Sequence, residues 1–343
     1  MEPVTHALTS LALARAGQRR LPRFGTAMLV VAGVAPDLDY ASYLGGASSF
    51  LRYDRTSLHS LPSSFVLGIA LAAAFYFLAF HRDKKTSGLE DSRFPRLTFG
   101  AAFLMCAIGI ATHLLLDIAS GVGVQLLWPF RTSWFALDLL REFDIWILLF
   151  LVVGLLFPML IGLVSEEIGE RKKRTSGGGS AIAALVLILA YVGARGLLHS
   201  RAVDLLESHD YHGRVALAAG AFPESTSPLE WRGVLSTDNT IEELGVPLGL
   251  GRDFDSEHSA TQYKPDDSPA LEAGQQTTAA QRFLKYARFP MASVVRTGNG
   301  YQFELRDARF ATDDASPSNI LVRARIGEDM HIPEQGFLFA SQR

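Results

Sequence analysis

The sequence predicts an α-helical membrane domain followed by a mainly β domain outside the membrane. Long apolar runs fill the first part of the chain, whereas the remainder is polar and alternates between apolar and polar side chains. The composition agrees, because 48% of the 343 residues are hydrophobic and only 20% are charged. We therefore expect the helical membrane domain at residues 1–198 and the β-rich domain at residues 199–343.

Charge and cysteine content exclude several classes of protein. The formal net charge is −3, so no basic surface for nucleic acid is indicated and we expect no nucleic-acid partner. Cys106 is the one cysteine in the sequence. It excludes an intrachain disulfide and a metal site built from several thiolates.

Five apolar runs are long enough to cross about 30 Å of hydrocarbon, which takes roughly twenty helical residues. They lie near residues 24–45, 61–80, 98–119, 145–164 and 180–198. A shorter apolar segment at residues 4–14 carries His6 and ends at a basic stretch. We expect about five spanning helices plus this short N-terminal helix.

The basic residues predict the orientation of these helices. Lys and Arg gather before residue 24 and in the loops at residues 81–96 and 165–179. Since basic loops stay on the cytoplasmic side, the loops at residues 46–60 and 120–143 face the other side. We expect an integral protein of the bacterial inner membrane, with its C-terminal domain on the periplasmic or extracellular face.

The C-terminal part carries strand signals. After a short helix at residues 202–207, apolar and polar residues alternate at residues 292–297, 301–305 and 320–326. A Gly-Asn-Gly turn separates the first two of these segments. Residues 253–276 are rich in Asp, Ser, Gly and Pro and are expected to form a loop.

Ionisable residues occur where hydrocarbon is expected, near the ends of the predicted spans. A charge inside the bilayer costs at least a few kcal/mol, so it persists only when it is paired, solvated or bound to metal. By the topology above, all of these residues approach one membrane boundary: His6, Asp37, Asp39, His59, His113, Asp117 and Asp144. Because the topology was derived without them, their convergence predicts a single site.

The types and spacing of these residues suit a metal. His113 and Asp117 are four apart and share one face of a helix. Asp37 and Asp39 follow Pro36, which interrupts regular helix and leaves both carboxylates near one pocket. Imidazole with carboxylate suits Zn²⁺, with Mn²⁺ or Fe²⁺ as alternatives, and the set is large enough for two or more ions. Each pair taken alone also fits a hydrogen-bonded pair or a turn without metal.

Several motifs resemble the YdjM-like family of membrane-bound metal-dependent hydrolases, over residues 1 to about 165. They are Thr5-His6, Pro36-Asp37-Leu38-Asp39, Arg55 with His59-Ser60, His113-x-x-x-Asp117, and Trp128-Pro129-Phe130 followed by Asp144. The ligand order is more distantly similar to that of zinc-dependent phospholipase C and the single-strand-specific zinc nucleases. One motif departs from the family pattern H-R-G-x-T-H-S, because Asp54 replaces its first histidine and Leu58 its threonine. Whether Asp54 acts as a ligand in that place is left open.

The resemblance implies a metal-dependent hydrolase, and we expect a phosphoesterase acting on a lipid or lipid-linked phosphate. Its metal ligands would be His6, Asp37, Asp39, His59, His113 and Asp117. Asp37 or Asp144 would accept a proton or orient a histidine, and Arg55 would contact phosphate unless it is an interfacial anchor. Partners would be membrane lipids. The alternative is a non-catalytic membrane scaffold or regulator with a structural metal centre.

Overall fold

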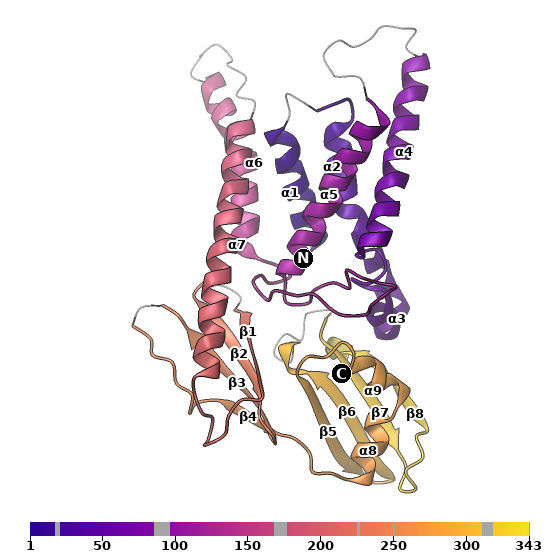
Figure 1. The fold of residues 1–343 in the computed structure, drawn as a ribbon, viewed down its shortest axis with the longest axis vertical. Helices are drawn as coiled ribbons and strands as arrows, with labels where there is room; N and C mark the ends of the chain where they lie inside the picture. Colours follow the sequence, from indigo (N-terminus) through magenta and orange to yellow (C-terminus); the bar gives the residue numbers. More distant parts are fainter. Residues whose placement is uncertain are drawn as a thin grey trace. The chain divides into compact units, whose positions relative to one another are not determined.

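The computed structural model describes residues 1–17, 21–85, 97–167, 177–224, 227–249, 251–310 and 318–342. Internal contacts divide the chain into two compact units. The helical unit comprises Met1–Asp39 and Arg55–Arg195, and the β unit comprises Tyr40–Asp54 and Gly196–Arg343. Figure 1 shows the helices of the first unit and the sheets of the second.

The helical unit is a bundle in which α1, α2, α4 and α5 pack on one another. Helix α2 packs against α1 and α5, and α4 packs against α5. A 3₁₀ segment, η2 (Ala35–Gly45), directly follows α2. The α-helices of this unit are α1 (Pro3–Ala16), α2 (Gly25–Val34), α4 (Leu61–Lys85), α5 (Phe99–Ala119), α6 (Ile145–Glu167) and the first part of α7 (Gly178–Glu207).

Three helices within the described ranges are long and apolar enough to cross a membrane: Leu61–Arg82, Phe99–Ala119 and Gly178–Glu207. In α6 the apolar helical stretch is Ile145–Pro158, which is shorter than these three. The apolar run at residues 24–45 is not one helix, because α2 ends at Val34 and Pro36 cannot donate the next helical hydrogen bond. A count of five spans therefore stays a prediction.

The predicted orientation also stays a prediction. Many of the basic residues that support it lie outside the described residues, at 18–20, 86–96 and 168–176.

Small residues let α1, α2 and α5 approach closely. A Cβ atom at Gly109 of α5 would lie 2.7 Å from the carbonyl oxygen of Leu29, and one at Gly33 of α2 would lie 2.0 Å from Ser10 Oγ. A larger side chain at Gly109 would push against the backbone of α2, and one at Gly33 would displace the Ser10 side chain. The glycines therefore permit the helix contacts that bring the polar residues of α1, η2 and α5 to one place.

The β unit contains two four-stranded antiparallel sheets with strands in sequence order. The strands expected at residues 292–297, 301–305 and 320–326 are confirmed as β5, β6 and β7. The first sheet is β1 (Ala218–Pro223), β2 (Glu230–Ser236), β3 (Thr240–Pro247) and β4 (Ala260–Tyr263), and the second is β5 (Pro290–Thr297), β6 (Gly300–Asp307), β7 (Ile320–Ile326) and β8 (Glu334–Phe339).

The expectation of a loop at residues 253–276 was wrong. Residues 253–276 contain β4 and helix α8 (Pro269–Gln275), which is followed by α9 (Thr278–Phe283). The start of α8 had a readable signal, because Ser268 accepts a hydrogen bond from the Leu271 backbone N–H and Pro269 occupies the first turn. Residues 46–60 contain helix α3 (Gly46–Tyr53), whose buried face is formed by Ala47 and Phe50.

Candidate metal centre

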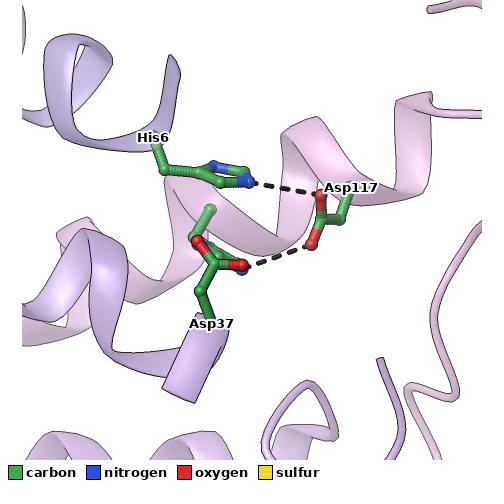
Figure 2. Close-up of side chains that lie close together, drawn as sticks. His6, Asp37 and Asp117 are labelled. Atoms are coloured by element: carbon green, nitrogen blue, oxygen red, sulfur yellow. Dashed lines mark ion pairs between the residues drawn. The ribbon is translucent and has the colours of Figure 1, made fainter. Parts of the chain in front are cut away.

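Four ionisable side chains meet inside the helical unit. His6 comes from α1, Asp37 from η2, and His113 and Asp117 from α5. Each offers one ligand atom, and these atoms all lie within 4.8 Å of one another. Figure 2 shows His6 and Asp37 approaching Asp117 from two different segments. The cluster can hold a metal ion, as the sequence predicted.

Asp117 lies at the centre of the cluster. Its Oδ1 is 3.3 Å from His6 Nε2, and its Oδ2 is 3.2 Å from His113 Nε2. The second distance joins residues one helical turn apart, so the spacing in the sequence fixes it directly. The side chains of His6, His113 and Asp117 are at most 1% exposed, whereas that of Asp37 is 12% exposed.

His59, which immediately precedes α4, also reaches this centre. Its Nε2 lies 3.1 Å from Asp117 Oδ2 and 2.9 Å from His113 Nε2. Two imidazole nitrogens at this separation either share one proton or direct both lone pairs at a common cation. The structure thus brings together five of the six predicted ligands, which are the four members of the cluster and His59.

The outer nitrogens of two histidines are held as metal-binding histidines usually are. His113 Nδ1 is 2.8 Å from the Gly33 carbonyl oxygen, and His59 Nδ1 is 2.9 Å from Asp39 Oδ2. A partner that accepts the Nδ1 proton turns the Nε2 lone pair toward the centre. Asp39 was predicted as a ligand. In the structure it contacts His59 Nδ1, where it can orient the His59 ring.

Several buried polar atoms at this site have no hydrogen-bond partner among the described residues. They are His6 Nδ1, Asp37 Oδ2 and Asp39 Oδ1, whereas His6 Nε2 lies 3.3 Å from Asp117 Oδ1 without hydrogen-bond geometry. A buried polar group without a partner costs about 1 to 3 kcal/mol. The His6 ring is instead held by stacking on His113, with centroids 3.7 Å apart. His6 and Asp37 each offer one ligand atom to the cluster of four within 4.8 Å, and that arrangement fits a bound cation.

Arg55 adds a positive charge beside the cluster. Its guanidinium lies 3.3 Å from Asp117 Oδ1, 3.2 Å from Ser120 Oγ and 3.3 Å from Glu142 Oε1. The predicted phosphate-contacting residue is thus engaged by carboxylates and a hydroxyl. Sequence reasoning missed Ser120 and Glu142. For Ser120 the sequence offered one signal, which is that it lies three residues after Asp117.

Asp144 and Asp54 have different surroundings. Asp144 accepts hydrogen bonds from the backbone N–H groups of Trp146 (3.1 Å) and Ile147 (3.2 Å), so it caps α6. The Tyr191 hydroxyl donates to its other oxygen at 3.2 Å. Asp54 directly follows α3 and is not a member of the four-residue cluster. These contacts give no support to a catalytic Asp144 or to Asp54 as a ligand.

Protons would compete with a bound cation at this centre. Burial raises the pKa of Asp37 to about 6, although the nearby His113 acts to lower it. Burial alone would lower the pKa of His59, but hydrogen bonds with Asp117 and Asp39 raise it to about 10. Without metal, His59 therefore carries a proton between two carboxylates. A metal bound through His59 would have to displace that proton, so its binding would weaken as the pH falls.

Comparison with known proteins identifies a family for the helical part. A sequence model described as YdjM inner membrane protein matches residues 1–202. No curated protein and no solved structure is significantly similar to the chain. The matched range contains every residue of the metal cluster, and it confirms the resemblance read from the motifs. The description names a membrane location and no chemical activity.

Proposed function

The chain belongs to the YdjM inner membrane protein family, and on this premise we propose that it is a membrane-bound metal-dependent hydrolase. The three apolar helices fit insertion into that membrane. The observation that carries the proposal is the buried convergence of His6, Asp37, His113 and Asp117, with ring nitrogens and carboxylate oxygens left without hydrogen-bond partners.

A divalent metal at this site would lower the pKa of a bound water and neutralise charge on a phosphoester. The donor set of imidazole and carboxylate suits Zn²⁺, with Mn²⁺ or Fe²⁺ as alternatives. His6, Asp37, His113 and Asp117 would hold a first ion, and His59 lies where it can join them or help to hold a second.

The chain's own residues have distinct roles in this proposal. Asp37 has the most exposed side chain of the four, at 12%, and is our candidate to accept a proton from the nucleophile. Arg55 compensates negative charge beside Asp117, and its guanidinium is the group best shaped to meet a phosphate oxygen. Asp39 orients His59 through its contact with Nδ1.

We propose a lipid or lipid-linked phosphate as the substrate. His113 and Asp117 lie in the last two turns of α5, one of the apolar helices long enough to cross the membrane. A centre at the end of such a helix is at the depth of lipid head groups. We further propose that this end faces the periplasm, as the distribution of basic residues in the sequence indicates.

A structural metal centre in a membrane scaffold or regulator is the second candidate. It is favoured by the nearly complete burial of His6, His113 and Asp117, because structural sites are closed whereas catalytic sites keep an open position.

Turnover separates the two candidates. Detergent-purified, metal-loaded protein is assayed on phosphodiester and phosphomonoester lipids, together with His113→Ala and a matched control, Thr112→Ala. Thr112 is the neighbour of His113 on α5 and donates its hydroxyl hydrogen to the Ile108 carbonyl oxygen. The hydrolase proposal expects turnover by the wild type and Thr112→Ala that His113→Ala lacks. Metal bound to the wild type, with background rates in all three proteins, would contradict it and favour the structural centre.

A further inference from the structure

One segment of the chain belongs to the β unit although both of its neighbours in sequence belong to the metal centre. Tyr40–Asp54, here called the bridging segment, is grouped with Gly196–Arg343 by its contacts. It contains the end of η2 and the whole of α3. The residue before it is Asp39 and the residue after it is Arg55.

Aromatic rings attach the bridging segment to the last strand of the β unit. Tyr43 and Phe50 lie with their ring centroids 4.7 Å and 5.8 Å from that of Phe339, which ends β8. Tyr43 and Phe50 also contact each other edge to face at 5.9 Å. Phe50 and Phe339 are both buried, so this contact holds α3 on β8.

The two ends of the segment meet at one carboxylate. The backbone N–H of Arg55 donates to Asp39 Oδ2 at 3.1 Å, and the same oxygen lies 2.9 Å from His59 Nδ1. Arg55 has φ of 53°, a left-handed conformation that residues other than glycine adopt only when their surroundings enforce it. Residues 40–54 therefore leave and re-enter the helical unit beside one carboxylate, that of Asp39.

We propose that the β unit positions the metal centre through the bridging segment, with Phe339 and Tyr43 as positioning residues. This inference rests on the proposed function, because it assumes that the cluster binds a metal. Loosening the rings would let residues 40–54 shift. The shift would turn Asp39 away from His59 and move Arg55 relative to Asp117. Neither aromatic residue needs to touch substrate or metal for this effect.

The test measures binding of Co²⁺ to the full chain in detergent, through the visible absorption that reports ligand number and geometry. Phe339→Ala and Tyr43→Ala each remove the contact from one side. Phe339→Leu restores an apolar group. We expect each alanine variant to raise the dissociation constant for Co²⁺ about 10-fold, as loss of groups that orient metal ligands does, and to change the spectrum. Phe339→Leu should recover much of the affinity.

Two controls separate positioning from general damage. Leu44→Ala changes a residue of the same segment that is 91% exposed, and it should leave Co²⁺ binding unchanged. Phe303→Leu disturbs the buried core of the same sheet under α8, away from α3. If Phe303→Leu and Phe339→Ala lower Co²⁺ affinity equally, or if Phe339→Ala has no effect, the inference is overturned.

Hydrogen exchange of peptides covering residues 53–60 gives a readout that does not depend on metal or on activity. Faster exchange in Phe339→Ala than in Phe303→Leu is expected, and equal exchange would contradict the inference. If the wild type binds Co²⁺ but hydrolyses no phosphoester, the proposed function fails while the positioning role is still decided by affinity and exchange. If the wild type hydrolyses lipid phosphate and Phe339→Ala changes nothing, the positioning role fails alone.

Discussion

Two buried clusters of charged groups in this protein differ in how completely they are satisfied. In the β unit, Asp307 accepts hydrogen bonds from the backbone N–H groups of Arg288 and Arg309, and its Oδ2 lies 2.8 Å from Arg309 Nη2. At the candidate metal centre, His6, Asp37 and Asp39 keep buried atoms without such partners. Both clusters are largely hidden from water, with Asp37 the more exposed member at 12%. The first is closed and structural, whereas the second has donor atoms left over for a ligand.

Breaking the closed cluster should have the largest effect on stability. Asp307→Ala leaves the buried Arg309 guanidinium without its carboxylate, so the free energy of unfolding should fall by about 3 to 5 kcal/mol. Denaturant titration of the full chain measures this. Asp255→Ala removes the exposed partner of His258 and should change stability far less. Equal losses in the two variants would mean that the Asp307 cluster is not a structural element.

Closing the gap between α2 and α5 should damage the metal centre. Gly109→Ala places a methyl group 2.7 Å from the Leu29 carbonyl oxygen, and such overpacking costs about 1 to 3 kcal/mol. It should also move His113 away from Gly33 and lower metal affinity. Gly100→Ala is the matched control in α5, because nothing lies within 4 Å of its added Cβ. Thermal unfolding and metal titration in detergent measure both effects, and wild-type affinity in Gly109→Ala would contradict the account.

Removing the His6 nitrogens should stabilise the metal-free protein instead of destabilising it. His6→Phe keeps a ring that can stack on His113 and deletes the buried Nδ1, which has no hydrogen-bond partner, together with Nε2, which lies 3.3 Å from Asp117 Oδ1 without hydrogen-bond geometry. The free energy of unfolding of the metal-free protein should rise by about 1 kcal/mol, while affinity for Zn²⁺ falls. Thermal unfolding with and without metal measures both. A variant destabilised without metal would show that the His6 nitrogens are already satisfied and would weaken the comparison.

The smallest expected effect is a pH dependence that belongs to the β unit alone. Burial acts to raise the pKa of Glu304, but hydrogen bonds from Arg306 and Arg323 hold it below its ordinary value of 4.5. Glu304 therefore binds fewer protons when folded, and its contribution is present above pH 4.5 and lost as the pH falls below it. Unfolding curves of wild type and Glu304→Gln should converge in acid. Curves that stay equally separated at all pH values would contradict this.

The sequence predicted the ligand cluster better than it predicted the residues around it. His113 and Asp117 are fixed by helical spacing, and Pro36 marks the break that places Asp37 beside them. Arg55 could not be placed in the same way, because its partners Ser120 and Glu142 lie in or beside an irregular stretch with no period. Asp144 was assigned to the site by its membrane depth, yet helix capping determines its contacts.

Long-range packing was the least predictable part of the fold. The segment at residues 40–54 looks like a continuation of the membrane domain in sequence, whereas Phe50 packs on Phe339 of the last strand. No local pattern encodes a contact across so many residues. The run at residues 24–45 was apolar enough to suggest one span, but composition alone did not show that α2 ends at Val34.

Metal content tests the central claim most directly. The wild-type protein and a His113→Ala, Asp117→Ala double variant are purified in detergent, checked for folding by thermal unfolding, supplied with Zn²⁺ or Mn²⁺, and analysed by plasma mass spectrometry. The account predicts at least one equivalent of metal per wild-type chain, lost in the double variant. Absence of metal from both proteins would contradict the claim that the cluster binds metal. The cluster would then be a hydrogen-bonded network in which His59 lies between Asp39 and Asp117.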